Sequence, residues 1–303
     1  MTIPQYQLET WSKQGATVTP KLIRERIEKV LTSAQSKIQH LNQLNIYLQG
    51  SYRNSTNIYG NSDVDVVVQS NQTYFSDTSQ LSKSEFENYD RSSIPATYLW
   101  DQFKADVVNT LRAGFGSDNV QIGNKSIKVK FDSFDADVVP CFEFRKYTKF
   151  DDSLVDHSYI SGIQLLTTKE RRTVVNYPKL HYVYGASKNQ NVNNMYKPCV
   201  RIFKNMKSRL VKDYSFDKEV APSYFIENLL YNVPNEIYNS STSYYTVVFN
   251  ILSWLFENKK DMDKFVCQNE QLYLFGNSPE QWNVSDAKTF LSEVIEMWNE
   301  WGR

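Results

Sequence analysis

Apolar residues in the first part of the chain follow a helical spacing and then a strand-like one. Thr19 is a typical helix cap residue, and Pro20 suits the first helical turn. From there apolar side chains recur every three or four positions as far as Leu41, which predicts one long amphipathic helix. Short apolar runs at residues 45–49 and 63–68 then predict two buried strands.

The next part of the sequence predicts a loop, a helix and two further strands. Residues 69–94 are rich in Ser, Asn and Gln, which predicts a loop, whereas residues 98–111 return to a helical spacing. Residues 127–131 alternate between apolar and lysine side chains, as in a half-exposed strand. Residues 134–139 form another strand-like run, which we expect to end at Pro140. A helix beside a mixed sheet is the expected arrangement.

The last third of the chain has a helical spacing. We therefore expect an α+β protein, with a mixed-sheet lobe at residues 1–175 and an α-helical lobe at residues 176–303, joined near residues 160–195. The helices predicted for the second lobe span residues 198–211, 222–231, 243–257 and 285–301.

Charge balance and cysteine content exclude several classes of protein. Lys and Arg number 34, as do Asp and Glu, and this zero net charge argues against a basic face for duplex nucleic acid. The N-terminus lacks the features of a signal peptide, and the apolar stretch 244–256 is too short to span a bilayer. We expect a reduced cytoplasmic protein without membrane contact. No disulfide or zinc spacing is found among Cys141, Cys199, Cys267, His40, His157 and His181.

Three aspartates carry the strongest chemical signal. Asp63 and Asp65 are two positions apart in a predicted strand, so their side chains project from the same face. Adjacent carboxylates repel each other unless a cation lies between them, and Mg²⁺ prefers such oxygen ligands. Asp137 lies in a second predicted strand and could complete a two-metal site, which stabilises both the attacking and the leaving oxygen of a phosphate transfer.

The dipeptide Gly50-Ser51 follows the first predicted strand. Glycine lets the backbone approach a phosphate closely, and backbone N–H groups together with a hydroxyl can bind it. Neither this dipeptide nor the Asp63–Asp65 pair is informative alone, because both patterns are common in turns. In this order, and followed by the third aspartate, they indicate metal-dependent phosphate chemistry.

At this point the sequence resembles a known family. The stretch from Leu48 to Val68, with Gly-Ser followed by Asp-Val-Asp, resembles the signature of the polymerase-β-like nucleotidyltransferases. Within that superfamily it most resembles the bacterial cyclic-oligonucleotide synthases, relatives of cyclic GMP–AMP synthase and the oligoadenylate synthetases. Residues 177–182, 196–205 and 222–231 resemble later segments of those enzymes in the same order. The implied fold has the active site in a cleft between a mixed-sheet lobe and a helical lobe.

The resemblance implies a role for each aspartate. Asp63, Asp65 and Asp137 would hold two Mg²⁺ ions, with Mn²⁺ as a substitute, and Asp137 would also help to activate the attacking ribose hydroxyl. The family usually has a Gly-Thr pair after the first loop, whereas this chain has Ser55-Thr56. The phosphate contacts of that loop therefore do not follow from the resemblance.

The resemblance also implies five nucleotide-binding residues. Gly50, Ser51, Lys204 and Ser223 would contact the donor triphosphate, and Tyr224 would stack on the donor base. Each of the last three has a structural alternative: Lys204 on a solvated helix face, Ser223 near a helix cap, and Tyr224 in the core.

The implied function is a metal-dependent nucleotidyltransferase that joins nucleoside triphosphates, ATP among them, into a cyclic di- or trinucleotide. By analogy, this product would be a second messenger in bacterial anti-phage signalling and would bind a separate effector protein. One alternative is a related enzyme that makes a linear oligonucleotide or modifies RNA or protein. Another is a catalytically dead nucleotide-binding module. We expect no obligatory nucleic-acid activator, because the chain has no net positive charge.

Overall fold

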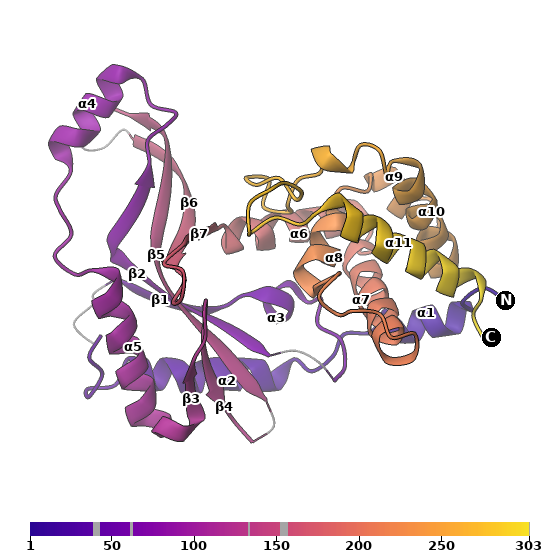
Figure 1. Cartoon of the computed structure of the whole chain (residues 1–303), viewed down its shortest axis with the longest axis horizontal. Helices are drawn as coiled ribbons and strands as arrows, with labels where there is room; N and C mark the ends of the chain where they lie inside the picture. The colour runs from indigo at the N-terminus through magenta and orange to yellow at the C-terminus, as the bar shows by residue number, and fades with distance from the viewer. Residues whose placement is uncertain (39–42, 61–62, 133, 152–156, 303) are drawn as a thin grey trace. The chain divides into compact units, whose positions relative to one another are not determined.

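The computed structural model describes the chain except residues 39–42, 61–62, 133, 152–156 and 303 (Figure 1). The chain divides into two compact units. The sheet unit comprises residues 18–49 and 63–178, and the helical unit comprises residues 1–17, 50–62 and 179–303. Two segments that the sequence analysis assigned to the first domain, residues 1–17 and 50–62, therefore belong to the helical unit.

The sheet unit is built on a mixed sheet, as expected. Strands β2 and β5 are parallel, whereas every other pairing between the named strands is antiparallel. Five strands follow the order β1-β2-β5-β4-β3. Outside this path, β6 pairs with both β5 and β7. The strands of the described residues are β1 (Leu44–Leu48), β2 (Val64–Asp77), β3 (Val120–Ile122), β4 (Ile127–Lys130), β5 (Asp135–Phe150), β6 (His157–Leu166) and β7 (Thr173–Asn176).

Two helices of the sheet unit, α2 (Val18–Leu31) and α5 (Trp100–Phe115), contact each other and pack against the strands (Figure 1). The expectation that the first helix extends to Leu41 was wrong, because the described helix ends ten residues earlier. The hydroxyls of Thr32 and Ser33 donate hydrogen bonds to backbone carbonyls of the last helical turns. These bonds compete with the backbone hydrogen bonds that would continue the helix. Leu41 itself lies outside the described residues, and the short 3₁₀ helix η1 (Ser117–Asn119) follows α5.

The loop expected at residues 69–94 was also wrong. β2 continues through its polar second half to Asp77, paired with β5, and helix α4 (Lys83–Ser92) follows with a capping box between Ser82 and Glu85. Pro140 does not end β5. The pairing of β4 stops at Val138 and that of β6 begins at Phe142, so no neighbour on that edge requires an N–H from this proline.

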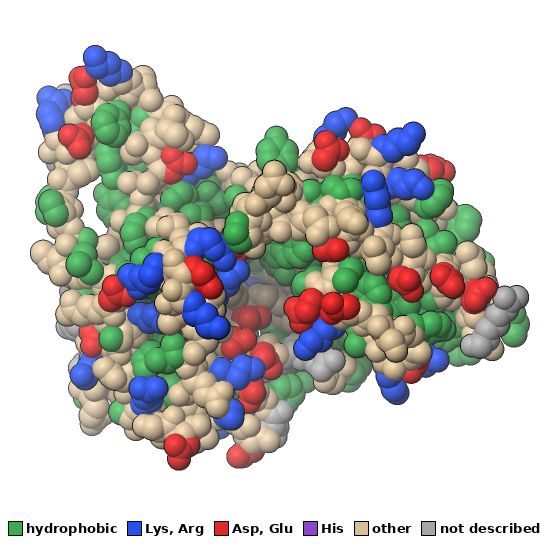
Figure 2. Space-filling view, in the orientation of Figure 1, with side chains coloured by type: hydrophobic (Ala, Val, Ile, Leu, Met, Phe, Trp, Pro, Cys, Tyr) green, Lys and Arg blue, Asp and Glu red, His purple; other side chains and the backbone are tan. Residues whose placement is uncertain are grey.

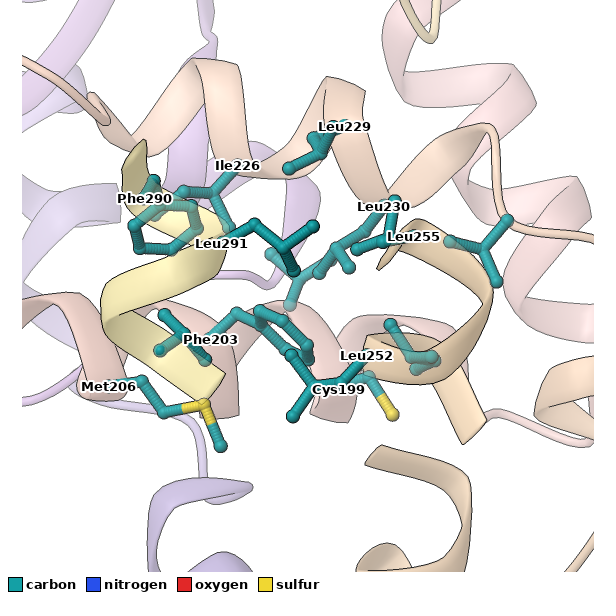
Figure 3. Packing of buried hydrophobic residues seen from close by; sticks show 14 of the residues in the cluster. Cys199, Phe203, Met206, Ile226, Leu229, Leu230, Leu252, Leu255, Phe290 and Leu291 are labelled. Atoms are coloured by element: carbon teal, nitrogen blue, oxygen red, sulfur yellow. The ribbon is translucent and has the colours of Figure 1, made fainter. Parts of the chain in front are cut away.

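The helical unit encloses one apolar core, and Figure 3 shows side chains from α7, α8, α10 and α11 meeting in it. The four helices predicted for this lobe are confirmed, and α1 packs on α7 and α10. The helices are α1 (Gln5–Trp11), α3 (Gly50–Asn54), α6 (Pro178–Asn191), α7 (Tyr196–Asp213), α8 (Ser223–Tyr231), α9 (Asn235–Tyr238), α10 (Tyr244–Glu257), η2 (Met262–Lys264) and α11 (Val284–Asn299).

The three cysteines are buried as free thiols, in agreement with the absence of a predicted disulfide. Within the described part of the chain, no helix combines the length and the hydropathy needed to cross a membrane. On the face shown in Figure 2, Lys and Arg side chains are interspersed with Asp and Glu side chains.

Candidate active site

The three predicted aspartates project from one face of the sheet. Asp65 of β2 is the register partner of Asp137 of β5, and Asp63 directly precedes β2. The alternation of the strand explains this placement, because Val64 and Val66 are fully buried on the opposite face. The parallel pairing thus brings together two carboxylates that are about seventy positions apart in sequence.

A lysine and a fourth carboxylate join this group. Lys128 of β4 is the register partner of Asp137, and its ammonium lies 2.8 Å from the Asp63 carboxylate and 3.5 Å from that of Asp135. The hydrogen bond to Asp63 raises the pKa of Lys128, and Asp137 and Asp135 add to this effect. Sequence reasoning missed both residues, because an alternating lysine on a strand is usually only a solvated side chain.

The surroundings of the Asp137 carboxylate disfavour its ionised form. Burial raises its pKa, and the neighbouring Asp63 and Asp135 carboxylates add to the effect. The hydroxyl of Ser126, 3.1 Å away, donates to Asp137 and together with Lys128 partly offsets this shift. An ionised carboxylate that is unfavourable in its own surroundings gains from a bound cation.

The chemistry of these donors fits a magnesium ion, because they are carboxylate oxygens clustered on one face and one of them has a raised pKa. Among the described residues, however, no three His, Cys, Asp or Glu side chains are already arranged around a metal position. Asp63 turns toward Lys128 instead. Of the two histidines that the structure describes, His181 is buried in the helical unit and His157 lies on β6, whereas His40 is outside the described residues.

Gly50 and Ser51 open the short helix α3, which belongs to the helical unit. Gly50 has φ +64°, a left-handed conformation that glycine adopts without steric cost. The carbonyl of Ser51 accepts a hydrogen bond from the Thr56 N–H, which closes the turn after the helix. Gly50 and Ser51 thus follow β1, as predicted, and their contacts with a phosphate stay a prediction.

Lys204 lies on α7 with only 3% of its surface exposed. Its ammonium pairs with the Glu227 carboxylate and also donates to the carbonyl and hydroxyl oxygens of Thr56, both at 3.2 Å. The alternative of a solvated helix face is wrong for this residue. Its predicted contact with the triphosphate stays a prediction.

Ser223 and Tyr224 form the first turn of α8, after Pro222. Ser223 is exposed, and Tyr224 is half-buried with its ring stacked on His181 at 5.0 Å between centroids. Trp282 contacts the same ring at 5.9 Å in a tilted arrangement. Both predicted residues thus lie at one helix start, and the stacking of Tyr224 on a base stays a prediction.

Comparison with known proteins gives matches over the whole chain. Residues 183–299 match the family described as the cGAS/DncV-like nucleotidyltransferase C-terminal helical domain. The cyclic nucleotide synthase CdnE01 of Staphylococcus haemolyticus is 53% identical, over 99% of this chain and 100% of that protein. The cyclic UMP-AMP synthase of Rhodothermus marinus is 40% identical and is covered in full.

Solved structures agree with the sequence matches. The structure of the Rhodothermus marinus c-UMP-AMP synthase with Apcpp and Upnpp has a TM-score of 0.88 and covers 99% of this chain and 98% of its own. The structure of the Elizabethkingia meningoseptica cyclic dinucleotide synthase with GTP and Apcpp has a TM-score of 0.78 at 30% identity, over 99% of this chain and 100% of its own. Fold and sequence therefore agree along the full length.

Proposed function

Because the chain belongs to the cGAS/DncV-like cyclic nucleotide synthases and is a nucleotidyltransferase, we propose that it joins nucleoside triphosphates into a cyclic di- or trinucleotide and releases pyrophosphate. The observation that carries this proposal is the register pairing of Asp65 with Asp137, with Asp63 on the same face. A relative that had become a binding module would have no need to keep these mutually repelling carboxylates.

The reaction transfers a nucleotidyl group to a ribose hydroxyl. The hydroxyl oxygen attacks the α-phosphate, the bond to pyrophosphate breaks, and the hydroxyl proton passes to a base. We assign that role to Asp137, whose carboxylate lies beside that of Asp65 on the same face of the sheet and can accept the proton. A second transfer of the same kind closes the ring.

Two Mg²⁺ ions, which Asp63, Asp65 and Asp137 would hold and which Mn²⁺ could replace, would polarise the phosphate oxygens and stabilise the departing pyrophosphate. The negative charge of the site comes from the carboxylates of these three aspartates. Gly50, Ser51, Lys204, Ser223 and Tyr224 would bind the donor nucleotide, with the triphosphate on the first four and the base on the ring of Tyr224.

The substrates and the biological role are part of the proposal. Two relatives are described in structures with triphosphates or their analogues, which supports nucleoside triphosphates, ATP among them, as substrates here. The relatives' names specify different bases, so sequence similarity alone does not assign the bases used by this chain. We further propose a second messenger in bacterial anti-phage defence that acts on a separate effector, made in the cytoplasm without an obligatory nucleic-acid activator.

The decisive experiment incubates the protein with labelled nucleoside triphosphates, singly and in pairs, with Mg²⁺ or Mn²⁺. We expect pyrophosphate release and a phosphatase-resistant product whose mass is that of a cyclic di- or trinucleotide. A phosphatase-sensitive oligonucleotide would mean that the product is linear. Absence of pyrophosphate release under all conditions would overturn the enzymatic proposal.

A further inference from the structure

A buried carboxylate that the proposed reaction does not use lies at the centre of the helical unit. Glu227 of α8 is 3% exposed, and four side chains from three segments of the chain contact its two oxygens. Lys204 and Thr56 meet Oε1, while His181 Nε2 and Asn54 Nδ2 meet Oε2 at 3.1 and 3.3 Å. Each partner is itself almost fully buried. Glu227 therefore joins α6, α7 and α8 to the segment that follows Gly50-Ser51.

The turn after α3 is held mainly by side chains of other helices. Ser55 has φ +59°, a conformation that costs energy for a residue with a Cβ. Arg201 of α7 donates to the Ser55 carbonyl at 2.5 Å, and Lys204 donates to the next carbonyl, that of Thr56. Contacts from outside the segment thus stabilise a conformation that the segment alone would disfavour.

The arrangement uses the hydrogen-bonding capacity of the central groups. The three N–H groups of Lys204 have three acceptor atoms, two on Thr56 and one on Glu227. Burial disfavours the charged form of Glu227, but Lys204 and His181 outweigh this and hold its pKa well below the usual range. The carboxylate is therefore ionised and fully occupied at neutral pH.

Stability alone does not account for such a group. A buried ion pair often contributes no more than well-packed apolar side chains of the same volume, whereas loss of one partner is strongly destabilising. The charged pair adds a fixed orientation of Thr56. The Thr56 hydroxyl donates a hydrogen bond to Glu227 and accepts one from Lys204. That hydroxyl lies five positions after Ser51.

We propose that Glu227, through Lys204 and Thr56, is a positioning residue for nucleotidyl transfer that fixes the donor-binding segment at residues 50–57. This inference rests on the proposed function of that segment. In this role Lys204 acts on the triphosphate indirectly, by holding the backbone that would bind it.

The test compares variants that keep or remove one hydroxyl. Thr56→Val preserves the side-chain shape and loses the hydroxyl, whereas Thr56→Ser keeps the hydroxyl and loses a methyl group. We expect Thr56→Val and Glu227→Gln each to raise the KM for the donor triphosphate at least about tenfold. Thr56→Ser should stay within about twofold of the wild type. Glu219→Gln, an exposed glutamate of the same unit, is the matched control.

Two further measurements separate positioning from general stability. Hydrogen exchange of the amides at residues 50–60 should accelerate in Thr56→Val, while the amides of α7 keep their protection. In the double variant Thr56→Val with Glu227→Gln, the fold-increase in KM should fall well short of the product of the two single increases. Both changes break the same contact. If Glu227→Gln does not fold, the Thr56 variants carry the test alone.

Three results would overturn the inference: an unchanged KM in Thr56→Val, equal losses in Thr56→Val and Thr56→Ser, or faster exchange at residues 50–60 with an unchanged KM. A failure of the proposed function is recognised separately, because the wild type would then form no product. Calorimetric binding of a non-hydrolysable ATP analogue would replace KM in that case, with the same expected ratios and the same overturning results.

Discussion

In the sheet unit, Asp63, Asp135 and Asp137 surround one ammonium, that of Lys128, which is about one-third exposed. In the helical unit, the single carboxylate of Glu227 is shared by an ammonium, an imidazole, a hydroxyl and an amide, all buried. In the first group, several carboxylates lie close to one another and share one described ammonium. The second is neutralised and hydrogen-bonded within the protein.

This difference indicates which cluster needs a ligand. Burial raises the pKa of Asp137, and the neighbouring carboxylates of Asp63 and Asp135 add to this effect. Glu227 has the opposite shift because its partners are already in place. A polar cluster whose hydrogen bonds are made within the protein holds a conformation, whereas a cluster of like-charged carboxylates is suited to bind a cation.

The largest effect should come from Asp63→Ala combined with Asp65→Ala. We expect nucleotidyl transfer to fall by at least about a thousandfold, because the site loses two of its three proposed metal ligands. The unfolding midpoint should be unchanged or higher, since removal of clustered like charges relieves repulsion. Product formation and thermal unfolding would be measured on the same sample.

Asp101→Ala is the matched control, because Asp101 is an exposed aspartate of the same unit. It should leave product formation within about twofold of the wild type. Loss of cooperative unfolding in the double variant would show that Asp63 and Asp65 are structural and that the site is misassigned.

The second effect concerns stability as a function of pH. At pH 7 Glu227→Gln should be less stable than the wild type, whereas Asp137→Asn should be more stable. At pH 7 Glu227→Gln should lose about 3–5 kcal/mol of unfolding free energy, as expected when one partner of a buried pair is removed. The folded-state pKa of Glu227 is lowered, so its stabilisation is complete above its ordinary value of 4.5 and is lost as the pH falls below it. The gap between wild type and Glu227→Gln should therefore shrink in acid.

The folded-state pKa of Asp137 is raised, so ionisation of this carboxylate costs stability at neutral pH. Asp137→Asn should accordingly be more stable than the wild type at pH 7, and this gain should disappear as the pH falls through the folded pKa toward 3.8. Denaturant titrations at several pH values would measure both gaps. Gaps of the same sign at pH 7 would contradict the assigned roles.

Next in size is the effect of Tyr224→Ala. Stacking on a base is worth about 1–3 kcal/mol, which corresponds to a loss of roughly 5- to 150-fold in nucleotide use. Tyr224→Phe keeps the ring face and should be nearly silent. Measurement of kcat/KM for both variants, and of the linear intermediate by chromatography, would check this. If Tyr224→Ala lowers the unfolding midpoint but leaves kcat/KM unchanged, the Tyr224 ring acts only in packing against His181 and Trp282.

The sequence predicted the fold class and the four main helices of the second lobe, since these depend on local periodicity. It failed at residues 69–94, where polar residues continue β2 along β5, because pairing with a distant strand outweighs low hydrophobicity. It also overextended the first helix, since Thr32 and Ser33 satisfy the terminal carbonyls that would otherwise favour continuation.

The candidate site was predictable only in part, for a similar reason. A period of two places Asp63 and Asp65 on one face, but the opposition of Asp65 and Asp137 depends on strand register. Glu227 gave no signal, because it lies in an apolar helix segment and its partners are distant in sequence. The resemblance supplied Lys204, and the structure supplied the residues it contacts.

The smallest expected effect concerns Lys128, whose ammonium partly neutralises the carboxylates of the sheet unit. Lys128→Met removes that charge, so a divalent cation should bind more tightly. Because Lys128 is partly exposed and solvent screens its charge, we expect a gain of only about three- to tenfold. Calorimetric titration with Mn²⁺, without nucleotide, would measure this. The highly exposed Lys21 offers a matched control, since Lys21→Met removes the same charge away from the carboxylates. Equal affinities in all three proteins would show that Lys128 and the cation do not compete, and the carboxylate face would then not be the metal site.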